Sequence, residues 1–190
     1  TGADALGSIL TWRDADELIR AYANGLLARG VAKGDTFAIL AQNSLDWALI
    51  DFALAQIGAV GVPIYANSSP RDVAYLLEHS EAVGVVCEDA EQLAKVEAAA
   101  EALPKLEHVL TYHDLAGLAA HGIDFARTQP TALDDASAAI EEDDLYTVIY
   151  TSGTTGPPKG CMIRHRNYYA MTSVVDDMED HYQPDDSMLL

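Results

Sequence analysis

The stretch Tyr150–Gly160, which reads YTSGTTGPPKG, places five hydroxyl side chains, three glycines and a lysine in one short segment. Small residues let the backbone approach an anion closely, and backbone N–H groups and hydroxyls can then surround phosphate oxygens. Lys159 adds a mobile positive charge, which suits a phosphate that has to leave. The apolar run Tyr146–Tyr150 is typical of a buried strand. The segment therefore predicts a phosphate-binding loop delivered by a strand.

A surface turn is the alternative interpretation, because segments rich in Gly, Thr and Pro are usually turns. The pattern here is narrower, since hydroxyl residues flank Gly153 and Gly156 and Lys159 follows three positions later. It also differs from the Walker A loop, G-x-x-x-x-G-K-[ST], because Pro158 stands where the second glycine would fall. Pro157 and Pro158 disfavour a loop that runs directly into a helix.

The composition indicates a globular and strongly acidic chain. Of its 190 residues, 49% are apolar, enough for one sizeable core or for one domain with an incomplete neighbour. The formal net charge is −19, which disfavours binding to nucleic acid or to an anionic membrane surface. No apolar run approaches the roughly 20 residues of a membrane span, and no secretory signal is recognisable. An anionic ligand would therefore depend on groups of the loop itself and on Lys159.

Cys87 and Cys161 lie far apart and form no metal-binding or disulfide pattern. We expect both to be small core residues in a reduced, cytoplasmic compartment, with membrane-peripheral association as an alternative for a longer enzyme. Five histidines show no ligand spacing and receive no functional role: His79, His108, His113, His121 and His181.

Cap residues and apolar spacing divide the chain into alternating helices and strands. Helices are predicted from Thr11 to about Arg29, from Ser44 to Gly58, after Ser69, from about Asp89 to Leu103, and from His165 onward. Strands are predicted at Thr36–Leu40, Val60–Ile64, Val83–Cys87, His108–Tyr112, Tyr146–Tyr150, Cys161–Ile163 and Ser187–Leu190. Residues 113–140 are expected to hold two short helices, followed by the acidic linker Glu141–Asp144.

This alternation predicts an α/β fold, in which a mostly parallel sheet is flanked by helices on both faces. Pro63 suggests that the second strand lies at an edge of the sheet or ends there. In the last helix an apolar stripe recurs at helical spacing, and we expect it to pack in the core: Tyr168, Met171, Val175 and Met178.

The motif YTSGTTGPPKG resembles the phosphate-binding signature of the adenylate-forming superfamily, which contains acyl-CoA synthetases, luciferases and peptide-synthetase adenylation domains. The longer stretch Asp143–Gly156, DDLYTVIYTSGTTG, is similar to the bacterial long-chain acyl-CoA synthetase branch in particular. The segments Thr11–Asp35 and Ala55–Pro70 are similar to earlier parts of that family. The resemblance thus covers nearly the whole chain, although only the loop motif is diagnostic by itself.

The resemblance implies the incomplete N-terminal part of an AMP-binding domain. Residues 1–140 would form an α/β subdomain, and residues 141–190 would carry the phosphate-loop strand and the start of the next subdomain. The matching motif positions imply that nucleotide phosphates are bound by Thr151, Ser152, Gly153, Thr154, Thr155, Gly156 and Lys159. Thr151 is also expected to contact Mg²⁺, and turn chemistry is the alternative role for each threonine. No catalytic residue is expected within this chain.

The implied parent is a long-chain fatty acid–CoA ligase, which activates its carboxylate with ATP to acyl-AMP and pyrophosphate and then forms the CoA thioester. ATP, Mg²⁺, CoA and a fatty acid are the implied cofactors and partners. The family's later motifs would supply the adenine and ribose contacts and the lysine that assists adenylation. This chain alone is therefore expected to be inactive. It is also expected to self-associate if it exposes apolar surface that its missing part would cover.

Two alternatives stay open. One is another adenylate-former, such as an aryl-CoA ligase or a peptide-synthetase adenylation domain, and the other is a truncated, non-catalytic nucleotide-binding module. Two positions also depart from the family pattern: Cys161 stands where an apolar residue is usual, and Arg164 replaces the Thr or Ser that caps the next helix. His165 and Asn167 fit the pattern, and their expected role is capping or packing.

Overall fold

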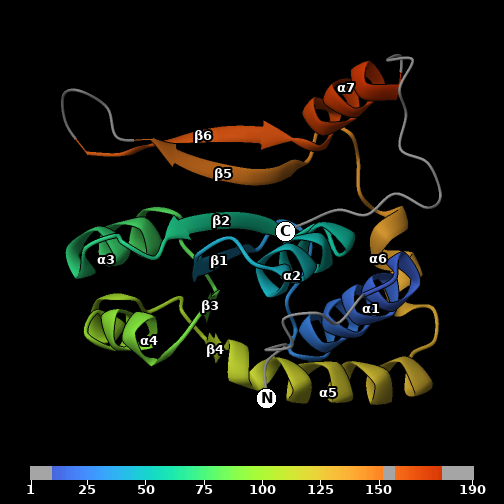
Figure 1. Cartoon of the computed structure of the whole chain (residues 1–190), viewed down its shortest axis with the longest axis horizontal. Coiled ribbons are helices and arrows are strands. Elements are labelled where there is room, and N and C mark those ends of the chain that lie inside the picture. Colours follow the sequence, from blue (N-terminus) through green and yellow to red (C-terminus); the bar gives the residue numbers. More distant parts are fainter. Residues whose placement is uncertain (1–9, 152–156, 177–190) are drawn as a thin grey trace.

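The sheet of this protein carries strands from both halves of the chain. The computed structural model describes residues 10–151 and 157–176. Within these ranges six strands form one sheet in the order β4-β3-β1-β2-β5-β6 (Figure 1). β1 to β5 pair in parallel, whereas β6 runs antiparallel to β5. The predicted α/β fold with a mostly parallel sheet is confirmed.

Helices alternate with these strands along the chain. The strands are β1 (Thr36–Ala41), β2 (Val60–Tyr65), β3 (Gly84–Cys87), β4 (His108–Thr111), β5 (Leu145–Thr151) and β6 (Lys159–Arg164). The helices are α1 (Trp12–Ala28), α2 (Leu45–Gln56), α3 (Pro70–His79), α4 (Ala90–Glu97), α5 (Leu115–Thr128), α6 (Ala132–Ala138) and α7 (His165–Asp176). No helix in the described ranges has both the length and the apolar character that crossing a membrane requires.

The first three helices begin at the predicted caps. The Thr11 hydroxyl accepts a hydrogen bond from the backbone N–H of Asp14, whose carboxylate accepts one from the Thr11 backbone in return. The Ser44 and Ser69 hydroxyls likewise accept hydrogen bonds from the backbone N–H groups of Trp47 and Asp72 at the starts of α2 and α3. Because such caps satisfy backbone groups within a few residues, they can be recognised from local sequence.

Two apolar clusters cover the two faces of the sheet. Along β1, Phe37 and Ile39 point to the cluster under α1, α2 and α5, whereas Ala38 and Leu40 point to the cluster under α3 and α4. Successive side chains of a strand face opposite sides, so a strand that is apolar throughout is covered on both. Figure 1 shows α3 and α4 on one side and α1, α2, α5 and α6 on the other.

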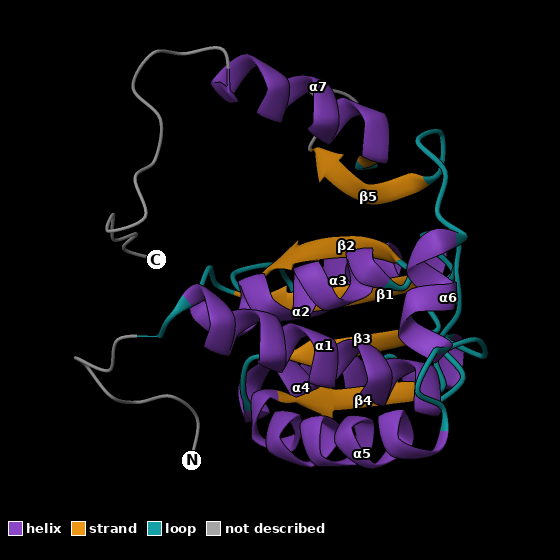
Figure 2. Cartoon of the chain, turned by 90° about the vertical axis from the view of Figure 1, so that its right-hand side faces the viewer, coloured by secondary structure: helices purple, strands orange, loops and turns teal. Residues whose placement is uncertain are grey.

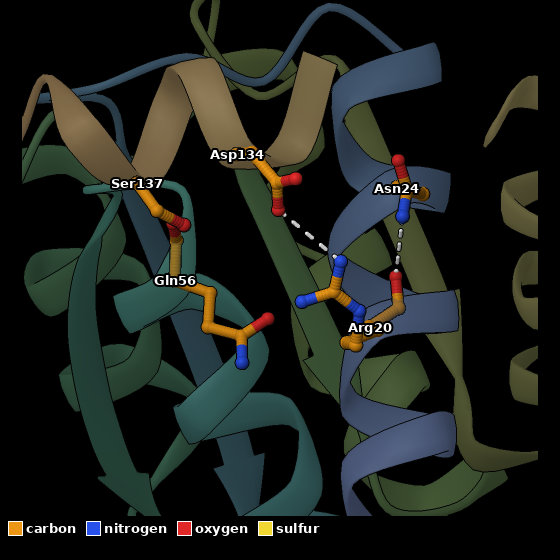
Figure 3. Close-up of polar contacts among 5 residues, drawn as sticks. All are labelled: Arg20, Asn24, Gln56, Asp134 and Ser137. Atoms are coloured by element: carbon orange, nitrogen blue, oxygen red, sulfur yellow. Dashed lines mark hydrogen bonds and ion pairs between the residues drawn. The ribbon is translucent and has the colours of Figure 1, made fainter. Parts of the chain in front are cut away.

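Helix α6 is fastened to α1 and α2 by polar contacts (Figure 3). Arg20 of α1 forms an ion pair with Asp134 at 3.2 Å, and its carbonyl accepts a hydrogen bond from the Asn24 amide. The Ser137 hydroxyl donates to the backbone carbonyl of Gln56 at 2.7 Å. Exposed ion pairs contribute about 0–1 kcal/mol. We infer that burial of Leu133 contributes more to the docking of α6.

Several predicted elements differ from the observed ones. α4 ends at Glu97 and is followed by a 3₁₀ turn, although Val96 and Leu103 still reach the same apolar cluster. Residues 113–140 form one helix of 14 residues and one of 7 instead of two short helices. The glycines of α5 lower its helix propensity, and packing against α1 compensates for this.

Pro63 was expected to mark an edge strand or the end of the strand. The first alternative is wrong, because β2 lies between β1 and β5, whereas β2 does end soon after Pro63, at Tyr65. The only register partners of β2 and β5 in the described ranges are Gly61 and Thr147. Pro63 pairs with β1 on the other side, so its missing N–H interrupts no ladder toward β5.

The apolar stripe of α7 was predicted to be core. This is wrong for Met171, which is 57% exposed, whereas the half-buried Tyr168 packs against the buried Tyr146 ring with centroids 4.2 Å apart. The side chains of Val175 and Met178, and the expected strand Ser187–Leu190, lie outside the described residues.

Candidate phosphate-binding site

The candidate site lies at the end of the β5–β6 hairpin where residues 152–158 join the two strands. Tyr150 pairs with Gly160, and Thr151 pairs with Lys159, so the two arms of the motif are held in register. A Cβ atom at position 160 would lie 2.7 Å from the Val148 side chain, which makes glycine necessary there. Thr151 and Lys159 are both exposed at the end of these arms. The structure thus brings the first and last predicted site residues together.

The remaining predicted residues of the site lie outside the described ranges: Ser152, Gly153, Thr154, Thr155 and Gly156. Their role in binding phosphate, and that of Thr151 in binding Mg²⁺, stay predictions. The predicted strand before the loop is present and longer than expected, running from Leu145 to Thr151. It is less buried than predicted, since Val148 and Tyr150 are half-buried.

Helix α3 contacts both arms of the motif through residues that the sequence analysis did not assign. The Tyr75 hydroxyl donates to the carbonyl of Pro158 at 3.2 Å. A hydrogen bond of 2.8 Å joins His79 Nδ1 and the Tyr150 hydroxyl. These partners are 83 and 71 positions apart, so no local pattern could have linked them.

The start of β5 is held by α2, which covers the face of the sheet opposite α3, and by the neighbouring strand β2. The buried Tyr146 donates its hydroxyl to Asp51 of α2 at 2.6 Å, and the Thr147 hydroxyl donates to the Gly61 carbonyl at 2.8 Å. Burial raises the pKa of Asp51, and the hydrogen bond from Tyr146 opposes that shift only in part. Burial also raises the pKa of Tyr146, so its phenol is protonated at neutral pH and can donate.

This arrangement predicts a pH-dependent effect of Asp51→Asn. Because the folded-state pKa of Asp51 is raised, its stabilising contribution is present below the unfolded-state pKa of about 3.9 and is lost as pH rises through the folded-state value. The asparagine does not titrate and still accepts from Tyr146. The free energy of unfolding of the variant, relative to wild type, should therefore increase from about pH 4 to pH 7. Urea unfolding at several pH values measures this difference.

The exposed Asp124 of α5 provides the matched control for that measurement. An equal change of relative stability with pH in Asp124→Asn and Asp51→Asn would contradict a specific role of burial at Asp51.

The residues after the hairpin are organised by the acidic linker. The Arg164 guanidinium donates to the Asp143 carbonyl, Arg166 pairs with the Asp143 carboxylate, and Asn167 accepts from the Arg164 backbone N–H. These contacts take the place of the cap that Arg164 was expected to remove. His165 is buried against the Tyr146 ring, with centroids 5.3 Å apart, so the expected packing role is confirmed.

The two cysteines differ. Cys87 is buried as predicted, and burial raises its thiol pKa to about 12. Cys161 is exposed, so the prediction of a core residue is wrong there. Its position faces solvent because nothing else in the described ranges covers that side of β6.

An apolar cavity of about 620 Å³ lies on the other side of the molecule, away from the motif. Its lining includes Ile19 of α1, Leu49 and Phe52 of α2, and His165 and Tyr169 of α7. None of the lining residues belongs to the 150–160 stretch. We therefore place the candidate site at the hairpin arms.

The chemistry of the hairpin end suits a polyanion. Hydroxyl groups and a lysine ammonium are hydrogen-bond donors to phosphate oxygens. Within residues 10–151 and 157–176, no group of three or more His, Cys, Asp or Glu side chains could hold a metal ion. Mg²⁺ commonly keeps waters and binds through few protein ligands together with substrate phosphates, and Thr151 fits that mode.

Comparison with known proteins points to one family. The model of the family described as AMP-binding enzyme matches residues 4–190. The long-chain-fatty-acid–CoA ligase FadD15 of Mycobacterium bovis is 37% identical over 169 residues, which cover 86% of this chain and 28% of that protein. The putative acyl-CoA synthetase YngI of Bacillus subtilis is 31% identical over 180 residues, covering 83% of this chain and 33% of that protein. The chain thus spans about a third of the relatives it matches.

Solved structures agree with the fold. The N-terminal domain of FACL13 from Mycobacterium tuberculosis, bound to an inhibitor, superposes with a TM-score of 0.76 at 27% identity. The match covers 91% of this chain and 42% of that one. The Mycobacterium tuberculosis fatty acyl CoA synthetase gives a TM-score of 0.73 at 26% identity over 92% of this chain and 33% of that one.

Proposed function

Because the chain belongs to the AMP-binding enzyme family, we propose that it is the N-terminal portion of a long-chain fatty acid–CoA ligase. The similarity to FadD15, a long-chain-fatty-acid–CoA ligase, supports a fatty acid as the substrate class. In this proposal residues 1–140 form an α/β subdomain, and residues 141–190 carry the phosphate-loop strand and the start of the next subdomain. The observation that carries the proposal is the hairpin that sets Thr151 opposite Lys159 across the family's phosphate motif.

The first half-reaction joins two anions. The fatty acid carboxylate attacks the α-phosphorus of ATP, which gives acyl-AMP and releases pyrophosphate. Preorganised donors are needed to hold the phosphates and to stabilise the charge that moves onto the leaving group. We propose that Thr151 and Lys159, which pair across the hairpin, supply two of these donors. Ser152 to Gly156 would add hydroxyl and backbone donors between them. When bound, Mg²⁺ neutralises phosphate charge, and Thr151 is the residue we assign to it.

The second half-reaction uses the product of the first. The thiol of CoA displaces AMP from the acyl group, which forms the thioester. The residues that would bind adenine, ribose and CoA belong to later motifs of the family, so we propose that the 190-residue chain alone does not catalyse either step.

Exchange of labelled pyrophosphate into ATP tests the first half-reaction. The encoded protein that contains this chain should catalyse the exchange only when a long-chain fatty acid is added. Exchange with an aryl acid or an amino acid instead would favour the other adenylate-formers. No exchange with any acid, together with retained Mg·ATP binding, would favour a non-catalytic nucleotide-binding module. Exchange by residues 1–190 alone would contradict the proposed inactivity of the chain.

A further inference from the structure

The end of the β5–β6 hairpin at which residues 152–158 join the two strands has no register partner in the main sheet within the described residues. β5 and β2 share the register pair Thr147 and Gly61 near the start of β5, and the rest of the hairpin extends beyond it (Figures 1 and 2). A two-stranded hairpin by itself is at best marginally stable in water. Side-chain contacts therefore help to fix the positions of Thr151 and Lys159, and the packing of Val148 and Tyr150 on the apolar cluster under α3 and α4 is one of them.

Helix α3 supplies those contacts on both arms. Tyr75 and His79 are four residues apart, so their side chains lie on the same face of the helix. Tyr75 binds the Pro158 carbonyl, next to Lys159, and His79 binds the Tyr150 hydroxyl, next to Thr151. The His79 ring also lies edge-on against the Tyr150 ring, with centroids 5.7 Å apart. One face of α3 thus contacts Tyr150 at the start of the motif and Pro158 near its end.

The helix itself is firmly placed. Val73, Leu76 and Leu77 are buried in the apolar cluster beneath it. The turn that precedes it is held by the Lys95 ammonium, which donates to the carbonyls of Ala66 at 2.7 Å and Ser68 at 3.2 Å. Burial raises the pKa of Tyr150, so its hydroxyl is a neutral hydrogen-bonding group at physiological pH. The firmly placed helix α3 therefore holds Pro158 and Tyr150 in fixed positions.

We propose that Tyr75 and His79 are positioning residues for the phosphate groups of the nucleotide, acting through Pro158 and Tyr150 on the two arms of the hairpin. The inference rests on the proposed function only in taking Mg·ATP as the ligand. Neither side chain has to touch the nucleotide. Their effect is to hold Thr151 and Lys159 at the separation that phosphate binding requires.

The test uses the encoded protein that contains this chain and measures the Kd of Mg·ATP by calorimetry and the KM of the acid by pyrophosphate exchange. Tyr75→Phe and His79→Ala should each raise the Kd of Mg·ATP about fivefold, since each loses one hydrogen bond. The KM of the acid and the thermal midpoint should stay at the wild-type values. His79→Asn, which keeps a hydrogen-bonding group near the place of Nδ1, should restore most of the affinity.

Two matched variants control for general effects. Tyr112→Phe removes a tyrosine hydroxyl that contacts Ser44, and His121→Ala removes an exposed helical histidine of α5. Neither should change the Kd of Mg·ATP. The proposal is overturned if Tyr75→Phe and His79→Ala bind Mg·ATP as wild type does, if Asn fails to restore affinity, or if wild type binds no Mg·ATP. Absence of acid-dependent exchange with the expected Kd changes would instead overturn the proposed function and support this inference.

Discussion

Lys159→Ala should lower acid-dependent pyrophosphate exchange by the encoded protein at least about 100-fold, the usual effect of removing one preorganised charge-stabilising group. Lys159 is the first residue of β6, is exposed, and pairs in register with Thr151. Lys159 is therefore carried at the end of the hairpin where residues 152–158 join the strands, which is where we propose that the phosphates of ATP bind. Calorimetric titration should also show weaker binding of Mg·ATP to the variant.

A second substitution separates charge from shape at this position. Lys159→Arg keeps the positive charge but replaces a compact ammonium by a planar fork, so we expect an intermediate loss of about tenfold. Lys105→Ala is the matched control, because Lys105 is an exposed lysine whose ion-pair partner is Glu81. Equal heats of Mg·ATP binding in wild type and Lys159→Ala, with unchanged exchange, would contradict the assigned role.

Gly122→Ala should destabilise the fold by about 3 kcal/mol, at the upper end for an overpacked core position. A Cβ atom at Gly122 would lie 1.9 Å from the Ala21 carbonyl oxygen and 2.6 Å from the Gly25 nitrogen. These are backbone atoms of α1, which cannot rotate away as a side chain can. Helix α5 would have to move off α1, and Leu118 would lose part of its burial. Urea unfolding monitored by circular dichroism measures the change.

The same helix provides the control. Gly117 also lies in α5, and a Cβ atom there meets nothing within 4 Å. Gly117→Ala should therefore stabilise the protein by about 0.5–1 kcal/mol through helix propensity alone. If Gly122→Ala were as stable as Gly117→Ala, the close contact between α1 and α5 would not be a determinant of the fold.

Expectations based on local signals agree well with the structure. Thr11, Ser44 and Ser69 begin helices, and Gly30 and Gly58 follow helix ends with positive φ angles. Each signal depends on contacts within a few residues, so the sequence contains all of its parts. The apolar runs that became β1 to β3 are likewise recognisable, because a strand buried on both faces is apolar throughout.

Expectations that depended on distant partners were less accurate. An edge position was one of the two alternatives for Pro63, although Thr147 of β5 lies beside Gly61 of β2 from 86 residues further along the chain. Cys161 and Met171 were placed in a core that does not cover them. Residues 113–140 were expected to hold two short helices, whereas α5 has 14 residues. Its glycines weaken the local helix signal, and its packing against α1 stabilises it. His79 received no role for the same reason, since its partner Tyr150 lies 71 residues away.

The sequence by itself determined the alternation of helices and strands, the two-sided burial of the sheet and the motif between Tyr150 and Gly160. Each of these features depends on residues that lie close together in the chain. Only the tertiary structure decided that α3 binds both arms of that motif through Tyr75 and His79. It also decided that α1 and α5 meet at Gly25 and Gly122. Such contacts depend on which surfaces the folded chain brings together, and no local pattern specifies the partner.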